Sequence, residues 1–213
     1  QHVKQLWPWL AAPGVRKWVL DNVFAGEVRN STLQFHVVPG RLGTGVPLSD
    51  QEISGHFEVN GTRFDIAGNI PPVRDGDGIV DFRGNSVDIS LSSGTVYLPS
   101  GRTVSASNGT FTLRRVHLEP VIGALEIDVA GSADAVTELA SYDPINAMRR
   151  LDMKPDDLSG DVSGHVTAQI PLSRGVPADS LPWKVALDYT NLAVSKPFDG
   201  QMVKDADGKI VVE

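Results

Sequence analysis

The chain has 213 residues, of which 41% are hydrophobic, so it can bury a sizeable core, and its 21 glycines and 14 prolines predict many turns. A formal net charge of −7 argues against a nucleic-acid partner, because such proteins normally present a basic surface. The absence of cysteine excludes disulfides, thiolate catalysis and thiolate metal sites together. No apolar run reaches the ~20 residues that cross a bilayer, and no signal-peptide pattern opens the sequence.

The first element predicted is a helix over residues 12–26. Pro13 suits the first turn, Gly26 suits the position after the last turn, and between them apolar residues recur at helical spacing: Val15, Trp18, Val19 and Val23. From Glu27 the period changes to two, which predicts a half-buried strand whose apolar side carries Leu33, Phe35 and Val37.

Turn signals then follow one another closely, and they predict an antiparallel meander from Ile53 to Leu118. Asn60-Gly61, Gly84-Asn85 and Asn108-Gly109 have the composition of two-residue hairpin turns, and Ser100-Gly101 is a fourth candidate. These turns would place the following apolar residues opposite one another: Phe57 and Phe64, Phe82 and Val87, Tyr97 and Val104, Ala106 and Phe111. A change of phase at Arg114-Arg115 predicts a β-bulge.

The second half of the chain alternates again after a helical interlude. Residues 125–129 form a predicted strand, followed by short helices over 136–140, capped by Ser132 or Asp134, and over 144–150. Every second residue from Leu158 to Leu172 is apolar or Gly, and Trp183 to Tyr189 repeats the pattern. Strands with one apolar and one polar side predict a sheet that buries only one face.

A weak internal repeat relates two parts of the sequence. Residues 74–80 and 204–210 each contain an acidic turn that leads into an apolar strand. We therefore expect a helix and meander over 1–130, a helical connection over 131–152 and a second β unit over 153–213, which together form one or two domains. The fold class expected is mainly β: a long curved antiparallel sheet, open or half rolled, with two or three short helices.

No residue pattern predicts catalysis, a metal site or a cofactor. The five histidines share no helix face, and the acidic run from Asp75 to Asp81 lacks the spacing of an EF-hand loop. Gly40, Gly43 and Gly45 have neither the lysine nor the following helix of a phosphate-binding loop, and no serine stands in a G-x-S-x-G motif. We expect a protein that is not an enzyme.

The chain resembles the AsmA-like family, the YhdP and TamB relatives of Gram-negative envelopes. The resemblance is carried by Leu6-Trp7-Pro8, Arg16-Lys17-Trp18-Val19 and Gly26, and by the stretch from Phe64-Asp65-Ile66 through Pro71-Pro72 to Gly76-Asp77-Gly78. It implies a periplasmic segment of a larger parent chain, whose inner-membrane anchor lies outside this sequence. It also implies a curved sheet with an apolar groove for acyl lipids, and it brings no catalytic residues.

The function expected first is the binding or conduction of phospholipid or other acyl lipid along an apolar β groove. The residues predicted to line the groove are Leu33, Phe35, Phe57, Phe64, Val162, Val166, Ile170, Val185 and Leu187. Taken one at a time, each of these residues also fits an ordinary closed core. A β-rich scaffolding module for envelope proteins is the alternative function, and a hydrolase is the third.

Overall fold

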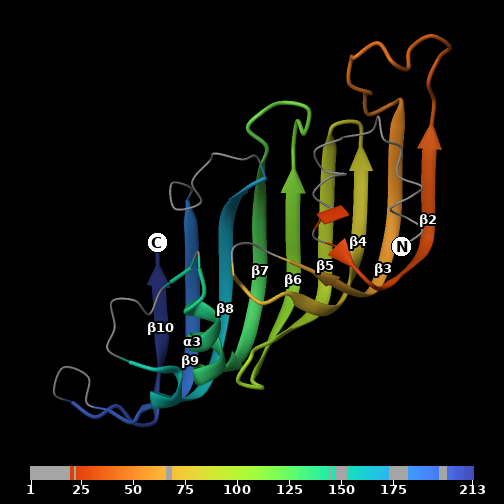
Figure 1. Ribbon diagram of the computed structural model, residues 1–213. Coiled ribbons are helices and arrows are strands. Elements are labelled where there is room, and N and C mark those ends of the chain that lie inside the picture. The colour runs from red at the N-terminus through yellow and green to blue at the C-terminus, as the bar shows by residue number, and fades with distance from the viewer. Residues whose placement is uncertain are drawn as a thin grey trace.

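The computed structural model describes residues 20–21, 23–65, 69–143, 145–146, 153–172, 182–196 and 201–213, and it contains one antiparallel sheet of ten strands. The strand order is β1-β3-β4-β5-β6-β7-β8-β9-β10, and β2 also pairs with β3, so consecutive strands are neighbours almost throughout (Figure 1). The sheet is open, because its first and last strands do not pair. The predicted mainly β fold and antiparallel meander are confirmed.

Apart from the short β1, the strands are long, and the connections range from the two-residue turn between β4 and β5 to the segment with α3 between β7 and β8. Their bounds are β1 Val23–Phe24, β2 Glu27–Phe35, β3 Ile53–Phe64, β4 Val73–Arg83, β5 Ser86–Tyr97, β6 Thr103–Leu113, β7 Ile122–Ser132, β8 Leu158–Pro171, β9 Trp183–Val194 and β10 Ala206–Val212. Because β7 and β8 pair from Ile122↔Pro171 to Ser132↔Asp161, the sheet continues across the predicted helical connection.

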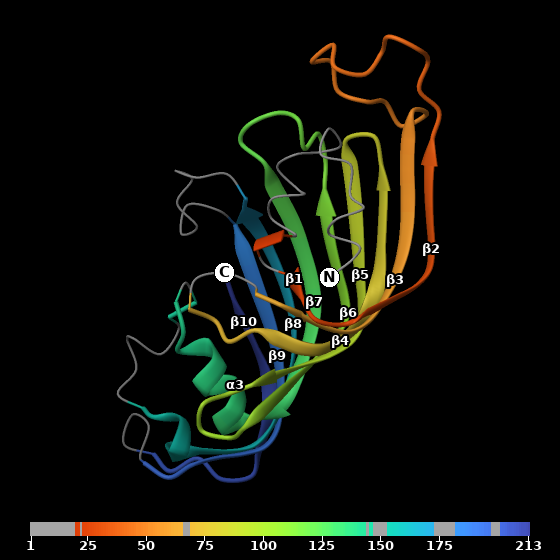
Figure 2. The same ribbon diagram turned by 45° about the vertical axis from the view of Figure 1, so that its right-hand side comes forward.

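The sheet is strongly curved, and its single described α-helix lies on the inner side of the curve (Figure 2). This helix is α3, Ala133–Ala140, which begins three residues before the predicted start. Ser132, one of the two predicted caps, is at the N-cap position, but its side chain makes no capping hydrogen bond. A 3-10 turn, η2, spans Pro155–Asp157. The expectation of two or three helices is therefore too high for the described part of the chain. The helices predicted over 12–26 and 144–150 fall largely on residues outside it, but the end of the first is wrong, because Val23–Phe24 form strand β1.

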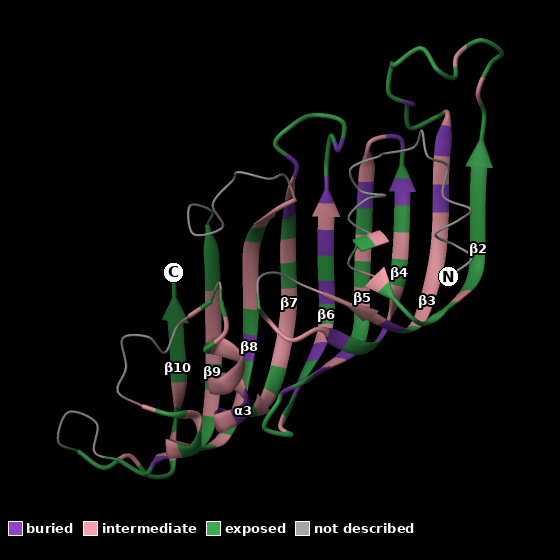
Figure 3. Cartoon of the chain, in the orientation of Figure 1, coloured by how far each residue is buried: buried purple, intermediate pink, exposed green. Residues whose placement is uncertain are grey.

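Alternation along each strand gives the sheet one apolar and one polar face. In β6, for example, buried and exposed residues alternate over most of the strand (Figure 3). Successive side chains of a strand point to opposite faces, and directly opposed residues of neighbouring strands share a face. Most of the buried apolar residues form two groups on the same face, at opposite ends of the strands.

The first group is covered by loops, and we call it the loop-covered cluster. Its members are Leu48, Ile53, Phe82, Val87, Phe111, Leu113, Val116 and Val121. Leu48 comes from the connection between β2 and β3, while Val116 and Val121 come from the connection between β6 and β7. Both loops are tied to Asn85 of the β4–β5 turn, since its side chain donates to the Leu48 carbonyl (3.0 Å) and its carbonyl accepts from Val116 N (3.0 Å).

The second group is covered by α3, and we call it the helix-covered cluster. It contains Val73, Val96, Leu98, Val104 and Ala135, and α3 adds Val136 and Leu139 to it. Val104 and Ala135 have no exposed surface. Helix α3 is thus held to the sheet by close apolar packing, which ordinarily supplies most of the stability of so short a helix.

Two of the three predicted Asn-Gly type turns are wrong. Gly84-Asn85 does turn the chain, with Phe82 opposite Val87 as predicted. Asn60-Gly61 and Asn108-Gly109 instead lie inside β3 and β6, at shifts in the pairing register, so Phe57 does not face Phe64 and Ala106 does not face Phe111. A hairpin turn and a β-bulge both need residues with positive φ, which Asn and Gly provide, so the dipeptide does not distinguish them.

Two further details of register differ from the prediction. The turn at Ser100-Gly101 exists, but it brings Val96 opposite Val104 and leaves Tyr97 exposed opposite Thr103. The change of phase at Arg114-Arg115 is the end of a strand, not a bulge, because β6 stops at Leu113.

The bulges inside the strands have a recurring stabilising contact. At four of them, a residue with positive φ lies beside a carboxylate of the next strand, and the bulge donates a hydrogen bond to it. The donor and acceptor pairs are Asn30 Nδ2 and Glu58 (2.6 Å), Gly61 N and Asp77 (2.9 Å), Asn108 Nδ2 and Asp128 (2.9 Å), and Asn191 N and Asp207 (2.8 Å). A bulge bends and twists its strand, so this row of bulges accounts for much of the curvature of the sheet.

The internal repeat has a structural counterpart in these bulges. Asp75 and Asp205, which match in the repeat, both have positive φ (53° and 51°). Two residues on, Asp77 and Asp207 each accept a backbone N–H from the bulge of the preceding strand. The β3–β4 and β9–β10 pairs are therefore built alike.

Glycine at position 123 is required by packing, because a Cβ there would lie 2.2 Å from Cζ of Phe111. We expect Gly123→Val to displace this ring from the loop-covered cluster and to lower the free energy of unfolding by about 1–3 kcal/mol. Ala124→Val is the matched control, since Ala124 is exposed on the other face of the same strand and should change stability by less than about 0.5 kcal/mol. Urea unfolding measures both, and equal effects would contradict the packing argument.

Candidate functional site

The apolar face of the sheet is the candidate site, because apolar residues continue across it from strand to strand. One transverse row runs through directly opposed residues of seven strands: Phe57, Val80, Ile89, Phe111, Leu125, Ala168 and Trp183. A second row contains Leu33, Gly55, Phe82, Val87, Leu113, Gly123 and Ile170. Neither row contains a polar side chain.

All nine residues predicted to line the groove lie on this face. Phe57, Leu33 and Ile170 belong to the two rows above, and Phe35 lies opposite the buried Ile53. The remaining five pair as follows: Phe64 with Val73, Val162 with Tyr189, Val166 with Val185, and Leu187 with Gly164. Within this face they lie near its two edges, in β2 and β3 at one edge and in β8 and β9 toward the other.

Burial differs between the middle of the face and its two edges. Phe57, Phe64 and the five predicted residues of β8 and β9 are half-buried. At the β2 edge Phe35 is 49% exposed, and at the opposite edge Trp183, Ile210 and Val212 are 40 to 46% exposed. Apolar surface of the same face therefore reaches water at both edges of the sheet.

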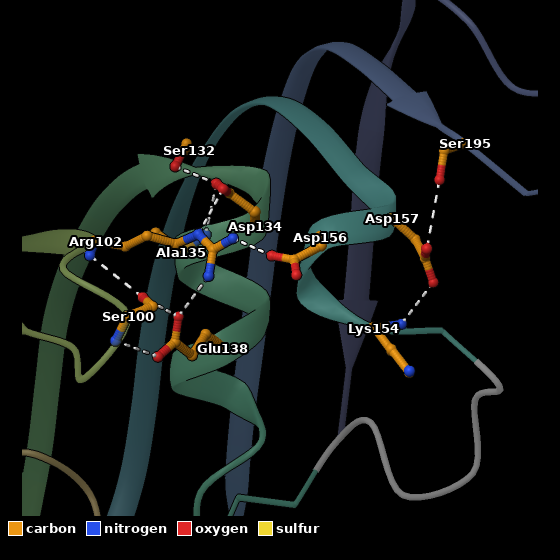
Figure 4. Close-up of polar contacts among 10 residues, drawn as sticks. All are labelled: Ser100, Arg102, Ser132, Asp134, Ala135, Glu138, Lys154, Asp156, Asp157 and Ser195. Atoms are coloured by element: carbon orange, nitrogen blue, oxygen red, sulfur yellow. Dashed lines mark hydrogen bonds and ion pairs between the residues drawn. The ribbon is translucent and has the colours of Figure 1, made fainter.

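A cluster of charged side chains fixes α3 over this face (Figure 4). Arg102, in the turn between β5 and β6, donates from Nε to Asp134 (2.6 Å) and from Nη1 to Glu138 (2.9 Å), both on α3. Its Nη2 also donates to Asp156 of η2. Ser100 of the same turn donates to Glu138, through its hydroxyl group and through its backbone N–H. We call this set of contacts the Arg102 clamp.

The clamp joins three segments that are distant in the sequence. Hydrogen bonds to Asp134, then to Asp156 and Glu138, raise the pKa of the Arg102 guanidinium above its usual range, so it is charged at every accessible pH. A guanidinium presents five N–H donors in a planar fork, which allows one residue to bind three carboxylates. The clamp therefore helps to fix the position of α3, in addition to the apolar packing of α3 on the helix-covered cluster.

On the polar face two histidines lie opposite carboxylates of the neighbouring strand. His165 contacts Asp128 through Nδ1 (2.7 Å) and Glu126 through Nε2 (3.3 Å), and His56 contacts Asp81 (2.8 Å). The hydrogen bond to Asp128 raises the pKa of His165, although partial desolvation opposes the shift. The same contact, followed by the one from Asn108, lowers the pKa of Asp128.

Sequence reasoning missed both the clamp and part of the apolar rows. Ile89, Leu125 and Trp183 stand at apolar positions of the predicted strands, but they are not among the residues predicted to line the groove. Nothing in the sequence indicates that Arg102 meets Asp134 and Asp156, because pairs separated by 32 and 54 residues depend on the packed fold.

Comparison with known proteins gives no family assignment: no family model, no curated protein and no solved structure matches this chain. In the part of the chain that the structure describes, no three or more His, Asp or Glu residues are grouped so that they could hold a metal ion. The described helices also include none with the length and hydrophobicity needed to cross a bilayer.

The Arg102 clamp can be tested by removing its charge. We expect Arg102→Gln to lower the melting temperature, because three carboxylates lose their common cation while the apolar packing of α3 remains. Arg83→Gln should leave the melting temperature unchanged, since Arg83 is an exposed arginine outside the clamp. Equal melting temperatures for all three proteins, measured by circular dichroism, would show that the clamp adds nothing to the packing.

His165 predicts a specific pH dependence. A pKa raised in the folded state gives stabilisation that is complete below the unfolded value of about 6.5 and is lost as pH rises through the folded value. We therefore expect His165→Gln to lower the urea midpoint more at pH 5.5 than at pH 8.5. His36→Gln provides the control, because His36 is exposed in the loop after β2. A His165→Gln effect that is independent of pH would contradict the ion pair with Asp128.

Proposed function

We propose that this chain is a non-catalytic segment of an AsmA-like periplasmic protein, and that its apolar sheet face binds acyl lipid. One observation carries the proposal: uncharged apolar rows cross the sheet from β2 to β9 and remain exposed at both edges. Large contiguous apolar surfaces are uncommon on soluble domains, and they usually mark a binding site.

The physical basis is the replacement of bilayer hydrocarbon by the side chains of the sheet. An acyl chain placed against Val166, Val185 and their neighbours leaves water, and each buried CH₂ group contributes about 0.8 kcal/mol. No ionised group on these rows would have to be desolvated. The charged residues that accompany them, such as Asp128 and His165, lie on the opposite face, where they keep that face in contact with water.

The cellular setting is part of the same proposal. It is supported by the resemblance of the sequence to AsmA-like proteins, which implies an inner-membrane anchor outside this segment and a larger parent chain. The net charge of −7 fits a partner that is not a nucleic acid. Movement of lipid along the face would then contribute to lipid transport across the envelope.

A scaffolding module is the second candidate, and the two covered clusters favour it. The loop-covered and helix-covered clusters are already closed by parts of this chain. In the described part β10 pairs with β9 alone, so the exposed apolar residues of β10 could bind another protein instead of a lipid. Lipid uptake by the purified chain distinguishes the two functions.

We expect the purified chain to bind a fluorescent fatty acid, and Val166→Asp to abolish this binding, because a charge would be placed in the middle of the apolar face. Leu33→Asp should weaken it, and this variant carries little risk of unfolding because Leu33 is 38% exposed at the edge. Thr167→Asp is the matched control: it adds the same charge one residue away, on the polar face, and should bind as the wild type does. Circular dichroism checks the fold of each variant. A folded wild-type chain that takes up no fatty acid would contradict the proposal and favour the scaffold.

A further inference from the structure

An open hollow of about 800 Å³ lies across β6, β7, β8 and β9. Residues of the polar face line most of it, and Leu125, Ala168 and Trp183 of the first apolar row also border it. One row of directly opposed residues lies along it: Thr110, Glu126, Thr167 and Lys184. Ala124 and Gln169, which also face each other, lie beside this row. Hollows of this volume are within the range that accommodates small ligands.

The charged groups that line the hollow already have partners within the protein. Glu126 lies 3.3 Å from Nε2 of His165, and Lys184 forms a 2.5 Å ion pair with Glu213. An ionic ligand would therefore have to compete with an existing partner at either group. The hollow is suited to a neutral ligand.

Its uncharged polar groups, in contrast, are free to bind. In the part of the chain that the structure describes, the hydroxyl groups of Thr110 and Thr167 and the side-chain amide of Gln169 have no hydrogen-bond partner. Each hydroxyl can donate and accept, and the amide offers two donors and one acceptor. Between them, the methyl groups of Ala124 and the threonines form a small apolar floor.

We propose that this hollow binds a neutral oligosaccharide. A sugar ring combines the two properties that the hollow presents, since its hydroxyl groups both donate and accept hydrogen bonds while its C–H face packs on methyl groups. The binding groups are the threonine hydroxyls and the Gln169 amide, and the paired charges of Glu126 and Lys184 border them. These hydrogen-bonding groups lie on the polar face, opposite the face proposed to bind lipid.

The test is a titration of the ¹⁵N-labelled chain, followed by NMR, with chitotriose, a neutral trimer of N-acetylglucosamine. We expect saturable shifts of the backbone amides of Thr110, Thr167 and Gln169. The Val166→Asp variant, which alters the proposed lipid site, should show the same shifts as the wild type. The deacetylated trimer has the same backbone and three ammonium groups, and it should bind more weakly. Comparable or tighter binding of the charged trimer would overturn the assignment to a neutral ligand.

The matched variants separate hydrogen bonding from shape. Thr167→Val combined with Gln169→Leu keeps the volume of the side chains but removes their polar groups, and we expect chitotriose to bind about tenfold more weakly. Thr190→Val, an exposed position on β9 outside the hollow, should not change the affinity. Absence of saturable shifts in the wild type, shifts confined to residues away from the hollow, or undiminished binding by the double variant would each overturn the proposal.

Discussion

Antiparallel pairing of strands that alternate apolar and polar residues is the constraint on which the rest of this structure depends. Because opposed residues of neighbouring strands share a face, the alternation of one strand is carried to the next, and ten strands produce one apolar and one polar surface. A shift by a single residue would exchange the two surfaces. Each cross-strand row described above, from Phe57 to Trp183 and from Leu33 to Ile170, requires that the register be kept over seven strands.

Such a sheet has to curve if its apolar face is to be covered by few segments, and the bulges supply the curvature. Bulges interrupt the ladder and leave polar groups without partners, which would be costly without compensation. Here the compensation is regular, since Glu58, Asp77, Asp128 and Asp207 each accept a hydrogen bond from the bulge beside them. Asp77 and Asp207, which lie in the acidic turns of the internal repeat, therefore have a structural role in the bulges.

Coverage of the apolar face is uneven, and this bears on function. Loops close one end of the strands and α3, positioned by the Arg102 clamp, closes the other, which leaves half-buried residues between them and exposed ones at the edges. A closed core would bury these residues further, whereas a fully open sheet would not form the two clusters. The intermediate state fits a surface that binds an apolar ligand while the chain itself remains folded, and the polar face stays available for a different kind of ligand.

Much of the fold, and the face that carries the candidate site, could be predicted from the sequence. Alternation in residues 158–172 and 183–189 determined two long one-sided strands, and it placed Val162, Val166, Ile170, Val185 and Leu187 on one face, because the period of a strand is a local property of the backbone. The sequence also determined where positive φ was needed, at Asn60-Gly61, Gly84-Asn85 and Asn108-Gly109. Only the tertiary structure decided that the second of these is a turn and the other two are bulges, because that depends on whether neighbouring strands pair on both sides of the dipeptide. The contacts of Arg102 with Asp134, Glu138 and Asp156, and the burial of each candidate residue, likewise depend on segments that are far apart in the chain and meet only when the sheet has formed.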